Sequence, residues 1–275
     1  MESTNKINTR PVDPKPSSTI LLVRDNPSGN NVEVLLIQRQ HSMSFGGAYA
    51  FPGGKIATED YSPNFFSLSN GPNDQVASLL LGLPKDGLSY FIGCIRECFE
   101  ETGVFLASKT IDSPFKFIKY LDIPKFRTYQ WQLNIEDITL ETICLRENIV
   151  LATNQLTYVS HWITPKTEKI RYTTRFFLAP MPPDQEEKHN NSETLRGLWI
   201  RPEEALYEHE HGKFNMFMPT IVNLQKICGF KSTEQLMNTK SRQQAEGIKS
   251  IEPKVLFKNG KRTVFLPNQP GYDDL

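Results

Sequence analysis

The sequence has few cysteines, no long apolar run and no excess of charge of either sign. Its four cysteines, in 275 residues, form no CxxC pair. A disulfide framework or a zinc ligand set is therefore not predicted, and we expect a reducing compartment. No window approaches the roughly eighteen consecutive apolar residues that a membrane-spanning helix needs. Lys plus Arg and Asp plus Glu number 31 each, so the net charge predicts neither nucleic acid nor an anionic membrane as a partner.

The two ends of the chain also lack targeting features. Residues 1–16 are polar and rich in Pro, Ser and Asn, without an apolar stretch, which predicts a flexible leader and not a signal peptide. The chain ends in GYDDL, which is not a peroxisomal tripeptide of the SKL kind. We therefore expect a cytoplasmic protein.

Apolar runs bounded by turn formers predict the strands. Residues 18–25 and 32–40 are rich in Ile, Leu and Val and are separated by NPSGNN, which predicts a β-hairpin. Residues 156–165 and 171–182 read as two further strands, and a short strand is expected around 198–200.

Helical periodicity is strongest in residues 88–102, where Gly103 stands at the position of a C-cap glycine. Two later helices are expected, one opening at Pro202 and one within residues 217–230. Strands on both sides of a central helix, without strict β-α-β alternation, predict an α/β or α+β fold with a mixed sheet.

We expect residues 17–275 to form one domain with three additions. These are an insertion at about 61–88 with one short helix, a helical excursion at about 126–150, and a basic, polar extension at about 231–275. The oligomeric state is not predicted.

The acidic end of the central helix is the main functional signal. At about 100° per residue, Glu97, Glu100 and Glu101 share one face, opposite an apolar stripe. Carboxylates three and four residues apart repel each other, and a divalent cation with oxygen ligands would compensate their charge. The alternative is a solvated acidic face, which is commoner in general. A Gly-Gly turn before the helix and a glycine after it favour a site.

At this point the sequence resembles a known motif. GGKIATED and RECFEETGV are similar to the Nudix box, G-x5-E-x7-R-E-U-x-E-E-x-G-U, with U apolar. The second half is complete from Arg96 to Val104, Gly54 takes the leading glycine, and Asp60 stands where the family has Glu. Residues 61–95 replace the seven-residue spacer, as in the long-insertion branch that includes the coenzyme A diphosphatases of animal peroxisomes. The resemblance implies a Nudix α/β/α sandwich with a mixed sheet and a catalytic loop-helix-loop.

The family's chemistry is metal-dependent hydrolysis of a diphosphate linkage. By this resemblance Glu97, Glu100 and Glu101 would bind Mg²⁺ or Mn²⁺, and Arg96 would hold a glutamate in place, with Arg96 and Glu97 counted as catalytic. A general base must lie within reach of the attacking water. The candidates are one of the helix glutamates or Glu193, for which an ordinary loop carboxylate is the alternative.

Three further residues belong to the predicted site. Gly53 and Gly54 would let the backbone pass close to the metal site. Arg39, at the end of a predicted strand, could contact a substrate phosphate bidentately. A surface arginine at a strand end is the alternative for Arg39.

The resemblance also implies a small-molecule nucleoside diphosphate substrate. Coenzyme A or acyl-coenzyme A would yield 3′,5′-ADP and (acyl-)phosphopantetheine. The stretch LLIQRQHSMSFGGAYAFPGG keeps the Leu-Leu, Arg39 and the F-P-G-G of the coenzyme A pattern but lacks its second arginine. Another substrate, such as NADH, ADP-ribose or a nucleotide sugar, and a non-catalytic Nudix-fold binding protein are the alternatives.

Overall fold

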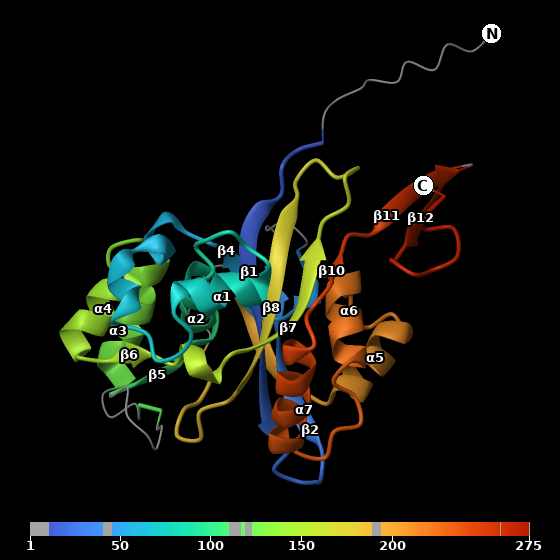
Figure 1. The fold of residues 1–275 in the computed structure, drawn as a ribbon. Coiled ribbons are helices and arrows are strands. Elements are labelled where there is room, and N and C mark those ends of the chain that lie inside the picture. The colour runs from blue at the N-terminus through green and yellow to red at the C-terminus, as the bar shows by residue number, and fades with distance from the viewer. Residues whose placement is uncertain are drawn as a thin grey trace.

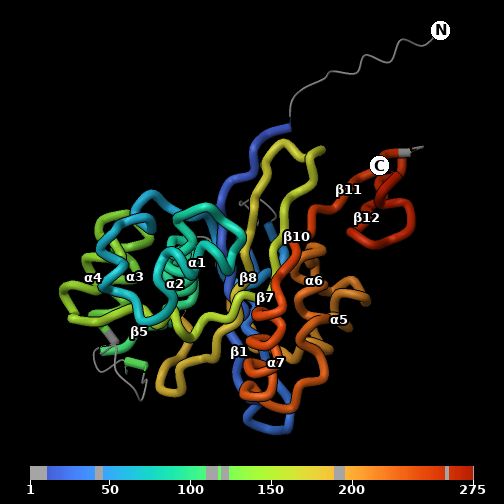
Figure 2. The backbone as a smooth tube through the Cα atoms, in the orientation of Figure 1, coloured from blue at the N-terminus to red at the C-terminus, as the bar shows by residue number. Residues whose placement is uncertain are grey.

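The computed structural model describes residues 11–40, 46–109, 117–118, 123–188, 194–258 and 260–274. A mixed sheet separates two groups of helices, as Figures 1 and 2 show. Its strand order is β10-β7-β8-β1-β2-β3, with β4 paired to β1 and β9 paired to β2. The strands are β1 (Lys15–Asp25), β2 (Val32–Arg39), β3 (Tyr49–Ala50), β4 (Gly53–Lys55), β7 (Thr157–Ile163), β8 (Tyr172–Pro180), β9 (Thr194–Ile200) and β10 (Ser250–Ile251).

The helices lie in two layers, one on each face of this sheet (Figure 1). The first layer contains α1 (Asp74–Leu81), α2 (Leu88–Thr102), α3 (Ile123–Asn134) and α4 (Leu140–Glu147). The second contains α5 (Pro202–Glu210), α6 (Met218–Gln225) and α7 (Thr233–Ala245). The predicted α/β class with a mixed sheet is confirmed.

Smaller elements complete the chain. Short 3-10 helices span Thr58–Tyr61, Pro63–Phe66 and Thr153–Gln155. Two-stranded pairs are formed by β5 (Ala107–Ser108) with β6 (Val150–Leu151), and by β11 (Lys254–Lys258) with β12 (Lys261–Phe265).

Strand β1 holds the two layers together. It pairs antiparallel with β2, as the predicted hairpin requires, and parallel with β8. Its side chains alternate between the faces: Ile20 and Leu22 belong to the apolar core on the α2 side, whereas Leu21 and Val23 belong to the core under α5, α6 and α7. A central strand covered on both faces reads as a continuous apolar run for this reason. The strand begins at Lys15, so two residues of the expected leader take part in the sheet.

Helix α2 has the bounds that the periodicity predicts. It is buried along most of its length, and Gly103 ends it with φ 71°, donating its N–H to the carbonyl of Phe99 at 2.8 Å. A left-handed residue with this hydrogen bond is a common way to end a helix.

The insertion before α2 has a structural role that was not predicted from the sequence. Asp74, at the start of α1, accepts hydrogen bonds from the backbone N–H groups of Leu88 at 3.0 Å and Asp86 at 3.1 Å. A carboxylate that accepts the free N–H groups at a helix start also lies favourably in the helix dipole. The insertion therefore supplies an acidic cap to the N-terminus of α2.

The C-terminal extension, which the sequence left unassigned, contributes α7 to the second layer. Helix α7 contacts β7, and β10 extends the sheet parallel to β7. In the part of the chain that the structure describes, no helix is both long enough and apolar enough to cross a membrane.

Candidate active site

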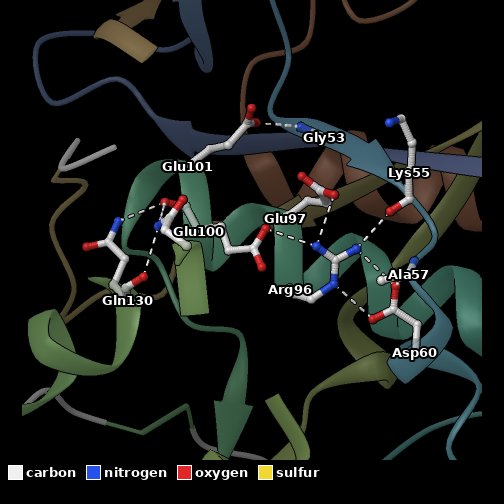
Figure 3. A network of polar contacts seen from close by, with 10 residues as sticks. Gly53, Lys55, Ala57, Asp60, Arg96, Glu97, Glu100, Glu101 and Gln130 are labelled. Carbon is white, nitrogen blue, oxygen red and sulfur yellow. Dashed lines mark hydrogen bonds and ion pairs between the residues drawn. The ribbon is translucent and has the colours of Figure 1, made fainter. Parts of the chain in front are cut away.

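Arg96 lies at the centre of a polar network on α2 (Figure 3). Only 5% of the residue is exposed, and each of the five N–H donors of its guanidinium has an acceptor. Nε and one Nη2 hydrogen bind Asp60 at 2.9 and 3.0 Å, and the second Nη2 hydrogen binds the carbonyl of Lys55 at 2.8 Å. Nη1 donates to Glu97 at 3.0 Å and to Glu100 at 2.9 Å. The side chain thus has one fixed position.

Asp60 anchors the network from outside the helix. The residue is 2% exposed, lies in the 3-10 helix Thr58–Tyr61, and also accepts the N–H of Ala57 at 2.8 Å. Its approach to α2 requires Gly93, because a Cβ there would lie 2.9 Å from Asp60 Oδ2 and 2.8 Å from Ile56 Cδ1. Asp60 therefore forms a bidentate, buried pair with Arg96, which is the strong form of such a contact.

Burial and charge act in opposite directions on this pair. Burial alone would lower the pKa of Arg96, but the carboxylates of Glu97, Asp60 and Glu100 together raise it well above its ordinary value. Burial also raises the pKa of Glu100, and Arg96 offsets this rise only in part. One guanidinium therefore does not compensate the carboxyl groups gathered around it.

Glu101 points away from Arg96 toward strand β4, as Figure 3 shows. The residue is 4% exposed, and its Oε2 accepts the backbone N–H of Gly53 at 2.7 Å. The three predicted glutamates therefore lie along one side of α2, two held by Arg96 and one tied to the glycine strand.

The two glycines of β4 are needed for different close approaches. Gly53 has φ 155°, and a Cβ on it would lie 2.6 Å from Thr19 Cα in the neighbouring strand β1. A Cβ on Gly54 would instead lie 2.5 Å from the carboxyl carbon of Glu97. Gly53 thus lets two strands pair, and Gly54 leaves room for a carboxylate.

We expect Gly53→Ala to lower the free energy of unfolding by about 1–3 kcal/mol, as overpacking does elsewhere. The reason is that the added methyl group meets backbone atoms of β1, which cannot rotate away as a side chain can. Urea denaturation measures the change. Gly29→Ala is the matched control, because its nearest atom would be an ordinary 3.5 Å away. Equal effects of the two substitutions would contradict this account of Gly53.

The donor chemistry of the three glutamates suits a divalent cation. Carboxylate oxygens are the ligands that Mg²⁺ and Mn²⁺ prefer, and Gly54 keeps the space next to Glu97 free of a side chain. Within residues 11–274, leaving aside the undescribed gaps, no three His, Cys, Asp or Glu side chains converge into a ready coordination shell. The metal site is therefore supported by the residue types and by the space that Gly54 leaves beside Glu97, and the ligand set stays a prediction.

The roles predicted for two other residues, Arg39 and Glu193, stay untested. Arg39 ends β2, where its backbone N–H donates to the carbonyl of Ala48 at 3.0 Å and it faces Thr194 across the β2–β9 pairing. Its contact with a substrate phosphate stays a prediction. Glu193 lies outside the described residues, so its role as a general base is untested.

A cavity of about 320 Å³ adjoins the C-terminal end of α2. Phe99, Phe126, Arg127, Gln130 and Lys188 are among the residues that line it. Gln130 is 1% exposed and donates through Nε2 to the carbonyls of Glu100 at 3.1 Å and Lys188 at 3.2 Å. The cavity wall is therefore hydrogen-bonded to the same helical turn that carries the glutamates.

Several of these functional neighbours were not among the predicted site residues. The motif could have pointed to Asp60, because this residue occupies the position of a motif glutamate. Its pairing with Arg96, however, joins residues 36 positions apart in the chain. Nothing in the sequence pointed to the Lys55 carbonyl or the Gln130 amide, since their contacts depend on how distant segments pack.

A helix with the R-E-x-x-E-E pattern, set against a Gly-Gly strand on a mixed sheet between two helical layers, defines a Nudix domain. The comparisons agree. The family model described as NUDT19 Nudix domain matches residues 72–227, which is more than half of the chain. The chain belongs to this family.

Two curated relatives carry the same name, acyl-coenzyme A diphosphatase NUDT19. The protein from Xenopus laevis is 23% identical over 238 residues, which cover 75% of this chain and 62% of that protein. The protein from Gallus gallus is 25% identical over 279 residues, covering 88% and 73%. The chain thus spans less than two thirds of the frog relative.

A solved structure supports the fold. A Nudix hydrolase from Alicyclobacillus acidocaldarius is 22% identical and superposes with a TM-score of 0.69, covering 84% of this chain and 98% of that one. At this identity the likeness shows the fold alone.

Proposed function

We propose that the protein is a metal-dependent hydrolase that cleaves the diphosphate linkage of coenzyme A or acyl-coenzyme A into 3′,5′-ADP and (acyl-)phosphopantetheine. The observation that carries the proposal is the network of Arg96 with Asp60, Glu97 and Glu100 on α2. The names of the two curated relatives support the choice of coenzyme A species.

Charge balance supports the need for a cation. Around Arg96 stand Asp60, Glu97 and Glu100, with Glu101 one residue further along α2. These are four carboxyl groups against one guanidinium, and a diphosphate would add more negative charge. In this proposal Glu97, Glu100 and Glu101 hold Mg²⁺ or Mn²⁺. When bound, such an ion supplies Lewis-acid stabilisation of charge on the phosphate oxygens.

The chain's own residues have distinct tasks in this scheme. Arg96, fixed by Asp60, orients the carboxylates of Glu97 and Glu100, and is in that sense a positioning residue. Gly54 keeps the Glu97 carboxylate accessible beside the backbone. Arg39 would contact a substrate phosphate. The base that takes a proton from the attacking water would be Glu193 or a helix glutamate.

The cavity beside α2 is the place that we assign to the organic part of the substrate. Phe99 and Phe126 offer apolar surface, and Arg127 and Lys188 offer positive charge. Asp184 and Glu186 line the cavity too, and Glu186 lies 3.9 Å from the ammonium group of Lys188. This combination suits a ligand with both an apolar arm and phosphate groups, as coenzyme A has.

Lys188→Ala is therefore expected to raise KM for coenzyme A about two- to fivefold and to leave kcat unchanged. The expected change in KM is small because the Lys188 side chain is 39% exposed, and an exposed charge contributes about 0.2–1 kcal/mol to binding. A contact made equally in the ground state and the transition state changes KM alone. Steady-state kinetics measure both constants, and Lys213→Ala, in the layer on the other face of the sheet, is the control. An unchanged KM would remove Lys188 from the substrate site.

We also propose that residues 17–275 act as one domain in the cytoplasm. The two apolar cores share strand β1, so neither is complete without it. Cys94, Cys98 and Cys144 are buried free thiols, as suits a reducing compartment.

A product assay tests the proposed function. Free coenzyme A, a medium-chain acyl-coenzyme A, ADP-ribose, NADH and UDP-glucose are incubated with the protein and Mg²⁺ or Mn²⁺, with EDTA as the metal-free control. We expect 3′,5′-ADP from the coenzyme A species. Preference for another diphosphate would overturn the substrate, and no cleavage of any compound would overturn hydrolysis in favour of a binding protein.

A further inference from the structure

A second cavity lies on the face of the sheet opposite α2. It measures about 490 Å³ and is bounded by β1 and β7 of the sheet and by residues from α6 to Ile248. Figure 1 shows α6 and α7 on the far side of the sheet from α2. Leu21, Val159, Ile227 and Ile248 give it apolar walls. None of the residues of the proposed active site lines it.

Lys240 brings a buried positive charge to this cavity. The residue lies within α7 and is 7% exposed. Its Nζ donates to Gln243 Oε1 at 3.0 Å, and the ring of Phe230 lies 5.8 Å away. An ammonium group has three N–H donors, and among the described residues no carboxylate lies within ion-pair distance of this one.

Lys226 adds a second ammonium group to the same cavity. It follows α6 directly, is exposed to solvent, and has no ion-pair partner in the described part of the chain. Burial lowers the pKa of Lys226, and burial together with the charge of Lys226 lowers the pKa of Lys240. A buried ammonium group and an exposed one thus lie at the same cavity. Glu246 also lines the cavity, but it is exposed and pairs with neither lysine within 4 Å.

Ordinary structural roles explain only part of this arrangement. Lys226 stands at the C-terminal end of α6, where the helix dipole favours a cation. The helix dipole does not explain Lys240, because this residue lies inside α7 and not at its end. A lysine usually extends its ammonium group to water, whereas this residue is almost wholly covered. A buried charge without a counter-charge is costly, which points to an anionic ligand.

We propose that this cavity binds a small organic phosphate monoester, with its phosphate at Lys240 and Lys226 and its apolar part against Leu21, Val159 and Ile227. A phosphate monoester carries a charge of about −1.5 to −2 at pH 7, which balances two ammonium groups better than a single carboxylate does. The apolar walls favour an organic ester over inorganic phosphate. The site is separate from α2 and does not depend on the proposed function.

Calorimetric titration and thermal unfolding test this site in the full-length protein with EDTA present. The probe is phenyl phosphate, with inorganic phosphate and benzoate as comparison ligands at equal ionic strength. We expect saturable binding of phenyl phosphate that raises Tm, and weaker binding of the other two. Lys240→Met keeps the apolar stem and should weaken binding at least about tenfold, since a hydrogen bond to a charged group is worth 1.5–3 kcal/mol.

The control variants separate this site from the active site. Lys213→Met, at an exposed lysine of the same layer, should bind phenyl phosphate as the unmodified protein does, and so should Glu100→Gln on α2. Lys240→Met without ligand should unfold cooperatively at an equal or higher Tm, because an uncompensated charge is removed. Absence of saturable binding, equal binding by Lys240→Met, loss of binding in Glu100→Gln, or benzoate binding as tightly as phenyl phosphate would each overturn the proposal.

Discussion

Arg96→Met is expected to lower the free energy of unfolding by about 3–5 kcal/mol, because it breaks a buried pair and leaves one charge without its partner. Asp60 is 2% exposed and receives two hydrogen bonds from Arg96. Without them its carboxylate has to be protonated or to draw water into the core. The Lys55 carbonyl also loses its guanidinium donor. The effect is therefore larger than that of an exposed ion pair.

Urea denaturation by two spectroscopic probes measures this change. Arg127→Met is the matched control, because it removes an exposed arginine of the same helical layer and should change stability by less than about 0.5 kcal/mol. If Arg96→Met unfolds the protein entirely, Asp60→Asn provides a milder break of the same pair. A loss below about 1 kcal/mol for Arg96→Met would contradict the structural role given to the network.

Glu100→Gln is expected to reduce kcat for coenzyme A cleavage by at least about 100-fold, the scale seen when one group that stabilises transition-state charge is removed. Its free energy of unfolding should stay equal or increase. Burial raises the pKa of this carboxyl group, which means that the fold disfavours its charged form. A neutral amide of the same shape does not carry that cost.

Glu204→Gln is the matched control for Glu100→Gln. Glu204 is also a helical glutamate bonded to an arginine, Arg201 at 3.3 Å, but it is half exposed on α5. Its replacement should change neither kcat nor stability. Normal activity in Glu100→Gln would remove this residue from the metal site, and a large loss of stability would mean that its role is structural.

Arg96→Met removes the centre of the network, whereas Glu100→Gln changes only one of its members. Asp60 and the Lys55 carbonyl fix Arg96 from the core side, while Glu97 and Glu100 take its remaining donors on the more exposed side. A substitution on the core side should act mainly on stability, and one on the exposed side mainly on activity. This separation follows from burial and not from the motif.

Local signals in the sequence predicted the central helix to the residue. The 3.6-residue apolar period and Gly103 define residues 88–102, and both act within a few turns of chain. The hairpin of β1 and β2 was predicted for a similar reason, since a short turn joins neighbouring strands.

The parts that the sequence did not predict depend on distant contacts. The parallel pairing of β1 with β8 joins segments more than a hundred positions apart. The cap that Asp74 gives to α2 could not be read from residues 61–88, because it depends on how the insertion folds back. Helix α7 was missed because its residues are mostly polar and only a few, such as Leu236, are buried.

The candidate site was also predicted only in part from the sequence. The motif places Arg96 and three glutamates on one helix, but it says nothing of which carboxylate Arg96 binds. In the structure that partner is Asp60 first, with Glu97 and Glu100 sharing one nitrogen. The roles of Arg39 and Glu193 stay predictions.

We propose that the carboxylates of α2 hold the metal with which the protein cleaves coenzyme A. The most direct test is the rate of 3′,5′-ADP release from coenzyme A as Mg²⁺ is titrated, for the unmodified protein and for Glu100→Gln. We expect no release in EDTA, a saturable rise with Mg²⁺ in the unmodified protein, and a rate at least about 100-fold lower in the variant. Release that is independent of metal, or equal in the two proteins, would contradict it.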